Sequence, residues 1–279
     1  MAYREYLPHP ALSHAVRCFW VFEHDYAGPR LERMLPDGHI DWVLHYGARP
    51  TIRVDGTEVS KRSAFMGGHL LRGVQLCFSG SLRSFGIKFY PWAAPLIYPM
   101  PAADLNHRRE PVADILRVRS PGLEDWLINE LSEGRFRAVI RRLEPLIAAW
   151  LSPPDARDRL LHGVCSMAMA AAGQLRVAEI ERRSGYSRRY IERVFSEKRG
   201  MSLKYFLRLL RLRPLAQQLV QATRGHLADF ALSAGYSDQA HFCRDFAAIV
   251  GVSPTRYQAE QNVYVNHDSL WTQDSIPEA

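Results

Sequence analysis

The chain has 279 residues, 47% hydrophobic and 23% charged, with a net charge of +7, as is typical of a globular protein of about two domains. No run of about 18 apolar residues is present, so no membrane span is expected, and the first residues, MAYREYLPHP, do not resemble a signal peptide. The four cysteines lack metal-binding spacing, which favours a reduced, cytoplasmic setting and predicts neither a metal nor a cofactor.

The first hundred residues predict strands, because they are rich in β-branched and aromatic residues. The predicted segments are Val16–Tyr26, His39–Tyr46, Thr51–Val59 and Gly73–Tyr90. Asp55-Gly56 and Gly80-Ser81 predict tight hairpin turns, and Asp37-Gly38 predicts an ordinary turn. We therefore expect a barrel-like, β-rich domain at the N-terminus, ended by a proline-rich stretch.

Helical periodicity begins after Pro111. Ser120-Pro121 is typical of a helix start, and Phe136–Leu151 predicts a second helix before a linker at Ser152–Asp155. Short helices separated by glycine-containing turns then continue to the polar C-terminus. The expected fold is α+β with three segments: a β-rich sensor or dimerisation domain with flanking helices (1–152), an all-α domain (155–261) and a tail (262–279).

Positive charge is concentrated in one part of the helical region. Twelve lysines and arginines against four acidic residues lie between Arg176 and Arg213, an excess of eight that exceeds the net charge of the whole chain, +7. A solvated helix face is one explanation. A surface that binds a polyanion such as DNA is the other.

A repeat at a spacing of about 50 residues occupies the same region, in Val177–Phe206 and Leu227–Tyr257. Each copy predicts a short helix, a Gly-Tyr-Ser turn and a second helix. Gly185 and Gly235 fit the left-handed residue that ends the first helix. Ser187 and Asp238 are suitable N-caps for the second helix. A purely structural helical repeat is the alternative to two helix-turn-helix units.

The second helix of each copy, which we term the reading helix, predicts an apolar inner face and a polar outer face. Five apolar residues are expected to point inward: Ile191, Val194, Phe195, Phe242 and Phe246. In a helix-turn-helix unit the start of this helix meets base edges in the major groove. Two copies in register with basic outer faces therefore indicate DNA binding.

Residues 160–257 resemble the DNA-binding domain of AraC-type transcription regulators. The closest pattern is AxxxGYSDxxHFCRDFxxxxGVSPTRY, between Ala231 and Tyr257. The resemblance implies seven helices, in which a long helix joins two helix-turn-helix units that enter adjacent major grooves of double-stranded DNA. It leaves room for a small-molecule effector and a homodimer, and for RNA polymerase as a partner if the protein is an activator. No membrane partner is expected.

By position in these motifs, the residues expected to meet base edges are Arg189, Glu192, Arg193, Gln239, Ala240, His241 and Arg244. Ser187, Arg188 and Asp238 stand at the starts of the two reading helices. Lysines and arginines nearby are expected to contact phosphates: Lys198, Arg199, Lys204 and Arg208. Pro214 lies in the joining helix, Leu203–Ala222, and predicts a bend or break there.

Three segments of residues 1–115 more loosely resemble an N-terminal domain of uncharacterised AraC-type proteins: LPDGHIDWVLHY, FMGGHL and FGIKFYPWAA. The resemblance implies a sensing or dimerisation role. Four aromatic residues could line a ligand pocket or simply pack in the core: Trp20, Trp42, Phe89 and Trp92. A second set could bind a metal or make ordinary hydrogen bonds: His39, Asp41, His45 and His69. Cys18 and Cys77 could form a redox pair or remain free.

Two other classes of function remain as alternatives. An enzyme, either DNA-modifying or acting on a small molecule, would need a nucleophile or metal set in the first 115 residues, and no tight set is present. A protein-interaction module would use the basic surface without selecting a sequence. The sequence favours a sequence-specific DNA-binding regulator that is not an enzyme.

Overall fold

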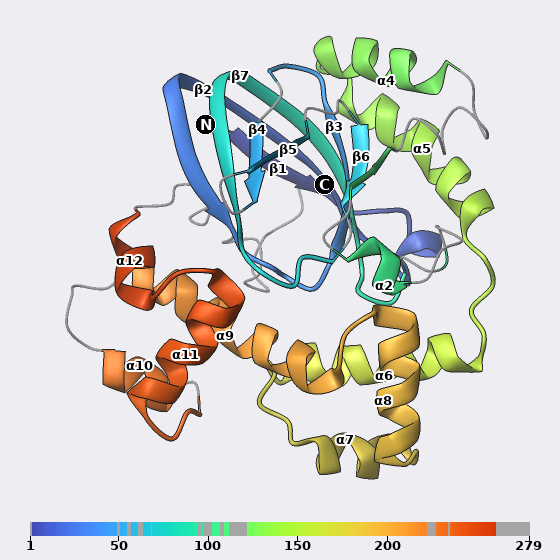
Figure 1. Cartoon of the computed structure of the whole chain (residues 1–279). Helices are drawn as coiled ribbons and strands as arrows, with labels where there is room; N and C mark the ends of the chain where they lie inside the picture. The colour runs from blue at the N-terminus through green and yellow to red at the C-terminus, as the bar shows by residue number, and fades with distance from the viewer. Residues whose placement is uncertain are drawn as a thin grey trace.

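The structure is a computed structural model with a β-rich N-terminal part and an all-helical C-terminal part (Figure 1). It describes residues 2–48, 51–54, 57–60, 64–67, 69–93, 96, 102–106, 109–111, 122–221, 227–233 and 235–260. The expected α+β fold with a helical C-terminal half is confirmed. None of the described helices combines the length and the apolar character needed to span a membrane.

The described strands form one antiparallel sheet. They are β1 (Ala2–Tyr6), β2 (Val16–Met34), β3 (Ile40–His45), β4 (Thr51–Val54), β5 (Thr57–Ser60), β6 (Ala64–Gly67), β7 (Val74–Phe89) and β8 (Arg109–Pro111). Their order is β1-β2-β7-β3-β6-β8, and β4 pairs with both β5 and β7. Within the described residues no ladder joins β1 to β8, so the expected barrel is an open, curved sheet (Figure 1).

The long ladder between β2 and β7 shows that the turn predicted at Gly80-Ser81 is wrong. Both residues lie inside β7, where Gly80 is opposite Tyr26 and Ser81 is opposite Asp25. Gly80 adopts a positive φ of 69°, and the register shifts between Tyr26 and Arg30, so the strands bend there without ending. The predicted Asp55-Gly56 turn lies outside the described residues, but β4 and β5 on either side pair as a hairpin requires.

Helices η1, α2, α4 and α5 belong to the N-terminal part, and helices α6 to α12 build the C-terminal part (Figure 1). The helices are η1 (Pro10–Leu12), α2 (Ala102–Leu105), α4 (Leu123–Ser132), α5 (Phe136–Trp150), α6 (Ala156–Ala170), α7 (Val177–Ser184), α8 (Arg188–Arg199), α9 (Leu203–Gln221), α10 (Leu227–Ser233), α11 (Gln239–Val250) and α12 (Pro254–Ala259). α5 packs on the sheet through Trp150, whose ring lies 5.1 Å from that of Trp42.

The largest hydrophobic core continues from the sheet into the first helix-turn-helix unit. Phe89 of β7, Ile147 of α5, Leu161 of α6 and Phe206 of α9 all belong to it and are almost fully buried. A second core holds the second unit together and also includes Leu35, which follows β2. The two parts of the chain therefore share buried apolar surface.

Helix α9 joins the two units and contains Pro214 without breaking. The predicted break is wrong, because the helix continues from Leu203 to Gln221. Pro214 is exposed, whereas Leu212 and Leu215 beside it are buried. The apolar contacts of these neighbours offset the lost backbone hydrogen bond, which costs about 3 kcal/mol in an unsupported helix.

Candidate nucleic-acid interface

The first helix-turn-helix unit consists of α7 and α8, and its turn is built as the sequence predicts. Gly185 ends α7 with a φ of 73°, in the left-handed region. Ser187 caps α8 by accepting a hydrogen bond from the Tyr190 amide. The Glu181 carboxylate accepts a further 2.9 Å hydrogen bond from the Arg188 amide, which ties the start of α8 to α7.

α8 has the expected two faces. Ile191, Val194 and Phe195 are buried in the shared core. Arg188, Arg189 and Arg193 are exposed on the opposite side. Glu192 is half-buried, and its Oε2 accepts a 3.2 Å hydrogen bond from the Leu203 amide at the start of α9. Glu192 therefore has a structural role besides the base contact predicted for it.

The second unit consists of α10 and α11 and repeats this construction. Gly235 has a φ of 73°. Asp238 caps α11 by accepting a 2.7 Å hydrogen bond from the His241 amide. That hydrogen bond and one from Ser237 hold the pKa of Asp238 below its ordinary value, so its carboxylate stays charged at the positive end of the helix. Phe242 and Phe246 are buried as predicted.

The residues that the second unit exposes at the start of α11 are those predicted to meet bases. Gln239, Ala240, His241 and Arg244 are all exposed. Arg244 makes no ion pair with any described residue. The two reading helices thus present polar, hydrogen-bonding side chains outward, as direct readout requires.

The basic residues near the reading helices fall into two groups. Five are exposed and form no ion pair within the described part of the chain: Arg188, Arg189, Arg193, Lys204 and Arg244. Others are held by acidic side chains of the protein. Lys198 lies 2.8 Å from Asp158, and Arg208 makes two hydrogen bonds, of 2.6 and 2.9 Å, to Asp245. Only the first group offers uncompensated positive charge.

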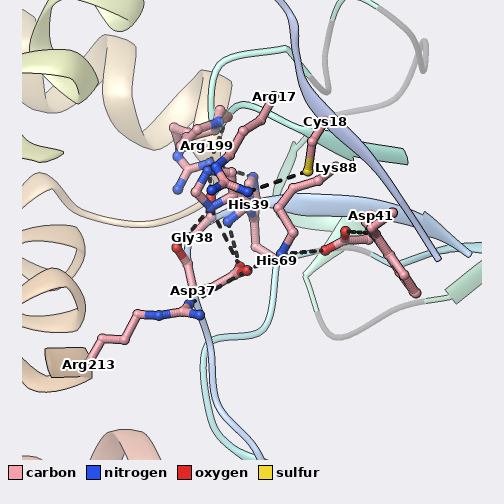
Figure 2. A network of polar contacts seen from close by, with 12 residues as sticks. Arg17, Cys18, Asp37, Gly38, His39, Asp41, His69, Lys88, Arg199 and Arg213 are labelled. Atoms are coloured by element: carbon pink, nitrogen blue, oxygen red, sulfur yellow. Dashed lines mark hydrogen bonds and ion pairs between the residues drawn. The ribbon is translucent and has the colours of Figure 1, made fainter. Parts of the chain in front are cut away.

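The prediction that Arg199 contacts phosphate is wrong for this structure. Its side chain is 0% exposed and lies between α8 and the N-terminal domain (Figure 2). Nη1 donates hydrogen bonds to the carbonyl oxygens of Gly38, at 3.1 Å, and Pro91, at 2.6 Å. Burial lowers the pKa of the guanidinium to about 10. The sequence places Arg199 at a helix end among other basic residues, which is typical of a DNA contact. Sequence alone does not show that the N-terminal domain covers this end of α8.

Asp37 is the acidic centre of the same junction, rather than part of an ordinary turn. It accepts a 2.7 Å hydrogen bond from Lys88 of β7, and Arg213 of α9 lies 3.6 Å away. Its other oxygen accepts the His39 amide at 2.8 Å. Figure 2 shows these side chains converging where the strands meet the C-terminal helices. Gly38 has a φ of 78°, and a Cβ there would lie 2.8 Å from the Phe206 ring, so both conformation and space require glycine.

The second unit is attached to the N-terminal domain by separate contacts. Arg33 of β2 makes two hydrogen bonds, of 2.9 and 3.0 Å, to the carboxylate of Glu260 after α12. The Gly73 amide donates a 2.7 Å hydrogen bond to the Ile249 carbonyl of α11. Tyr205 of α9 donates to the Leu71 carbonyl. Sequence patterns gave no signal for these partners, because each pair joins residues far apart in the chain.

Of the four aromatic residues proposed to line a pocket, Trp42 and Phe89 are in contact, with ring centroids 6.0 Å apart, but the four do not line one cavity. Trp20 belongs to a core cluster with Cys18 and Phe22, whereas Trp42, Phe89 and Trp92 belong to the shared core. Trp42 alone lines a cavity, of about 30 Å³, with residues such as Phe85 and Leu143. This volume is that of about one water molecule, far below the roughly 300 Å³ typical of ligand pockets.

The histidines considered as metal ligands have other contacts. His45 lies 2.8 Å from the Ser84 hydroxyl, and both ring nitrogens of His69 lie within 3.3 Å of Arg199 Nη1. Asp41 accepts a 2.9 Å hydrogen bond from the Trp20 indole. Cys18 and Cys77 are free thiols at separate positions of the β2–β7 ladder, so the redox pair is not formed.

Comparisons with known proteins agree with this geometry. Residues 4–111 match a domain of unknown function (DUF6597), and residues 180–260 match a helix-turn-helix domain. The transcriptional activator AarP of Providencia stuartii is 32% identical over 91 residues, which cover 33% of this chain and 67% of AarP. The probable transcription factor PqrA of Proteus vulgaris is 31% identical over 84 residues, 30% of this chain and 68% of PqrA.

Two further regulators match over about a third of their own length, 34% and 31%. Among solved structures, ToxT from Vibrio cholerae is 11% identical with a TM-score of 0.45, over 88% of this chain and 98% of that one. The helix-turn-helix match and the regulators that it resembles in sequence show that this chain belongs to the AraC-type family of DNA-binding transcription regulators.

Proposed function

We propose that the chain binds double-stranded DNA sequence-specifically, with α8 and α11 in adjacent major grooves on one face of the duplex. The observation that carries this proposal is that both reading helices expose an arginine that forms no ion pair with a described residue, Arg193 and Arg244, at matching positions of the repeat. Arginine can donate two hydrogen bonds to guanine O6 and N7. Arg189, Gln239 and His241 add polar groups beside them, and Ala240 suits the methyl group of thymine.

The starts of the first reading helix and of the joining helix provide the contacts to the sugar-phosphate backbone. Ser187 and Arg188 stand where the first reading helix begins, and Lys204 is the exposed lysine at the start of α9. The Asp238 carboxylate caps α11 and is assigned no phosphate contact, because both groups are negatively charged. Phosphate contacts position the protein without selecting a sequence. Lys198 and Arg208 are assigned to ion pairs within the protein instead.

We assign a regulatory role to the N-terminal domain, because it fixes the placement of both units through Asp37, Arg199 and Arg33. A small-molecule effector, a second copy of the chain or RNA polymerase would act through this domain or through its junction with the C-terminal helices. In this proposal the regulator works in the cytoplasm and catalyses no reaction. An apolar effector would bind most readily at the small apolar cavity between Trp42 and helices α4 and α5, and would widen that cavity as it enters.

Selection from a randomised duplex library by the full chain tests the proposal. We expect the bound duplexes to share two short motifs about one helical turn, roughly 34 Å, apart. Binding that shows no preference among duplexes, with the same dependence on salt for all of them, would identify a basic interaction module instead.

A further inference from the structure

The two reading helices differ in what lies beneath their matching arginines. In the first unit, the Arg193 guanidinium lies over the Tyr190 ring, with Cζ 5.1 Å from the centroid. Tyr190 in turn stacks on Tyr186, with centroids 5.3 Å apart and planes inclined by 19°. Tyr186, Tyr190 and Arg193 therefore form one continuous stack at the start of α8, in which Tyr190 is half-buried against the shared core and the other two are exposed.

The second unit has no such stack among its described residues. Tyr236 matches Tyr186 in the repeat, but it is 5% exposed, whereas Tyr186 is 44% exposed. Tyr236 packs into the second core and meets the edge of His241, which occupies the place of Tyr190. One extra residue, Ser237, separates this tyrosine from its helix cap, so its ring can turn inward.

We propose that Tyr190, supported by Tyr186, is a positioning residue that orients Arg193 for base recognition and makes the first unit the more selective of the two. The inference rests on the proposed function. The ring attracts the face of the guanidinium. The five N–H groups lie in the plane of the guanidinium, so stacking leaves them free to bond to guanine.

Orientation before binding matters because a free arginine loses rotamer freedom when it binds DNA. Arg193 makes no ion pair with a described residue, so its contact with the Tyr190 ring is what restrains its side chain on the protein surface. Arg244 has no such ring contact with a described residue, and its charge acts instead on the Asp238 carboxylate at the start of α11. An exposed cation–π contact corresponds to about a two- to fivefold change in an equilibrium constant.

The test compares variants of the full chain on the randomised duplex library. We expect Arg193→Ala to remove the preference at one base pair, and Tyr190→Leu to weaken the preference at that same pair about two- to fivefold. Tyr190→Phe keeps the ring and should retain the wild-type preference. Tyr186→Ser leaves Tyr190 in place and should cause a smaller loss at the same pair.

The controls separate positioning from a general structural role. Trp126→Leu removes an exposed aromatic ring from α4 and should leave every base preference unchanged. An unaltered preference in Tyr190→Leu, or an equal loss at all base pairs in a folded Tyr186→Ser protein, would overturn the inference. If the wild-type chain selects no sequence, the proposed function itself fails. If the wild-type chain selects a motif that Tyr190→Leu does not change, only the role of Tyr190 fails.

Discussion

Arg199, the last residue of α8, donates a 2.6 Å hydrogen bond to the carbonyl oxygen of Pro91, just beyond Phe89 at the end of strand β7. The first reading helix is therefore fastened at its C-terminal end to the N-terminal domain. Asn106, after α2, reinforces this attachment with a 2.7 Å hydrogen bond to the carbonyl of Gly200. The domain that would sense a signal thus holds the helix that would read DNA.

Replacing Arg199 is expected to destabilise the whole chain. Arg199→Ala leaves the carbonyls of Gly38 and Pro91 without their donor and opens a cavity beside Phe206. We expect the free energy of unfolding to fall by about 2–4 kcal/mol, measured by urea denaturation. Arg189→Ala is the matched control on the exposed face of α8, and its unfolding free energy should stay within about 0.5 kcal/mol of wild type. Equal effects of the two substitutions would argue against the buried role of Arg199.

The shared core predicts the behaviour of an isolated helical domain. Sequence alone suggests that a fragment of residues 155–261 folds independently, because its helices have their own apolar faces. The structure packs Leu161 and Phe206 in one core with the sheet, and pairs Glu260 with Arg33. We therefore expect the fragment to unfold at a lower urea concentration than the full chain, when followed by circular dichroism. A fragment as stable as the full chain would show that these contacts contribute little.

Two buried histidines at the junction predict the pH dependence of stability. Burial holds the pKa values of His39 and His69 well below the ordinary 6.5. The positive charge of Lys88 adds to this effect for His39, and that of Arg199 adds to it for His69. Below about pH 6.5 the unfolded chain takes up protons that the folded chain does not, so their contribution to stability is present above that pH and lost as the pH falls. We expect each to lower the unfolding free energy by up to about 1.4 kcal/mol per pH unit below it. His69→Gln should reduce this slope in urea melts at pH 7.5, 6.5 and 5.5; an unaltered slope would contradict the assignment.

The division of basic residues predicts different salt dependences of DNA binding. Lys204 is exposed, whereas Lys198 is paired with Asp158 at 2.8 Å. Lys204→Ala should weaken binding to all duplexes alike and lower the slope of log K against log salt by about one. Lys198→Ala should leave that slope unchanged and reduce thermal stability. The reverse pattern, measured by fluorescence anisotropy at several salt concentrations, would show that Lys198 reaches phosphate.

The parts of the fold that the sequence predicts well are those set by neighbouring residues. Gly185, Ser187 and Asp238 end or cap helices as their types require, since these contacts span only a few residues. The inward positions of Ile191 and Phe242 follow from helical periodicity in the same way. Local chemistry and amphipathic spacing therefore give both helix-turn-helix units.

The parts that the sequence predicts poorly depend on distant partners. Arg199 lies in a basic segment, yet the N-terminal domain covers it. Gly80 is typical of a hairpin turn, but pairing with β2 keeps it inside a strand. Pro214 contradicts its helix locally, and the packing of Leu212 and Leu215 keeps the helix continuous. In each case tertiary contacts outweigh a local preference.

The most direct test of two-helix recognition maps the base preferences of Arg193→Ala and Arg244→Ala on duplexes selected by the wild-type chain. Arg193 and Arg244 lie on separate reading helices at matching positions of the repeat. We expect each substitution to abolish the preference at one base pair, at a cost of about 1–3 kcal/mol, and the two base pairs to lie about one helical turn apart. If both substitutions affect the same base pair, or neither changes any preference, then α8 and α11 do not read DNA together as proposed.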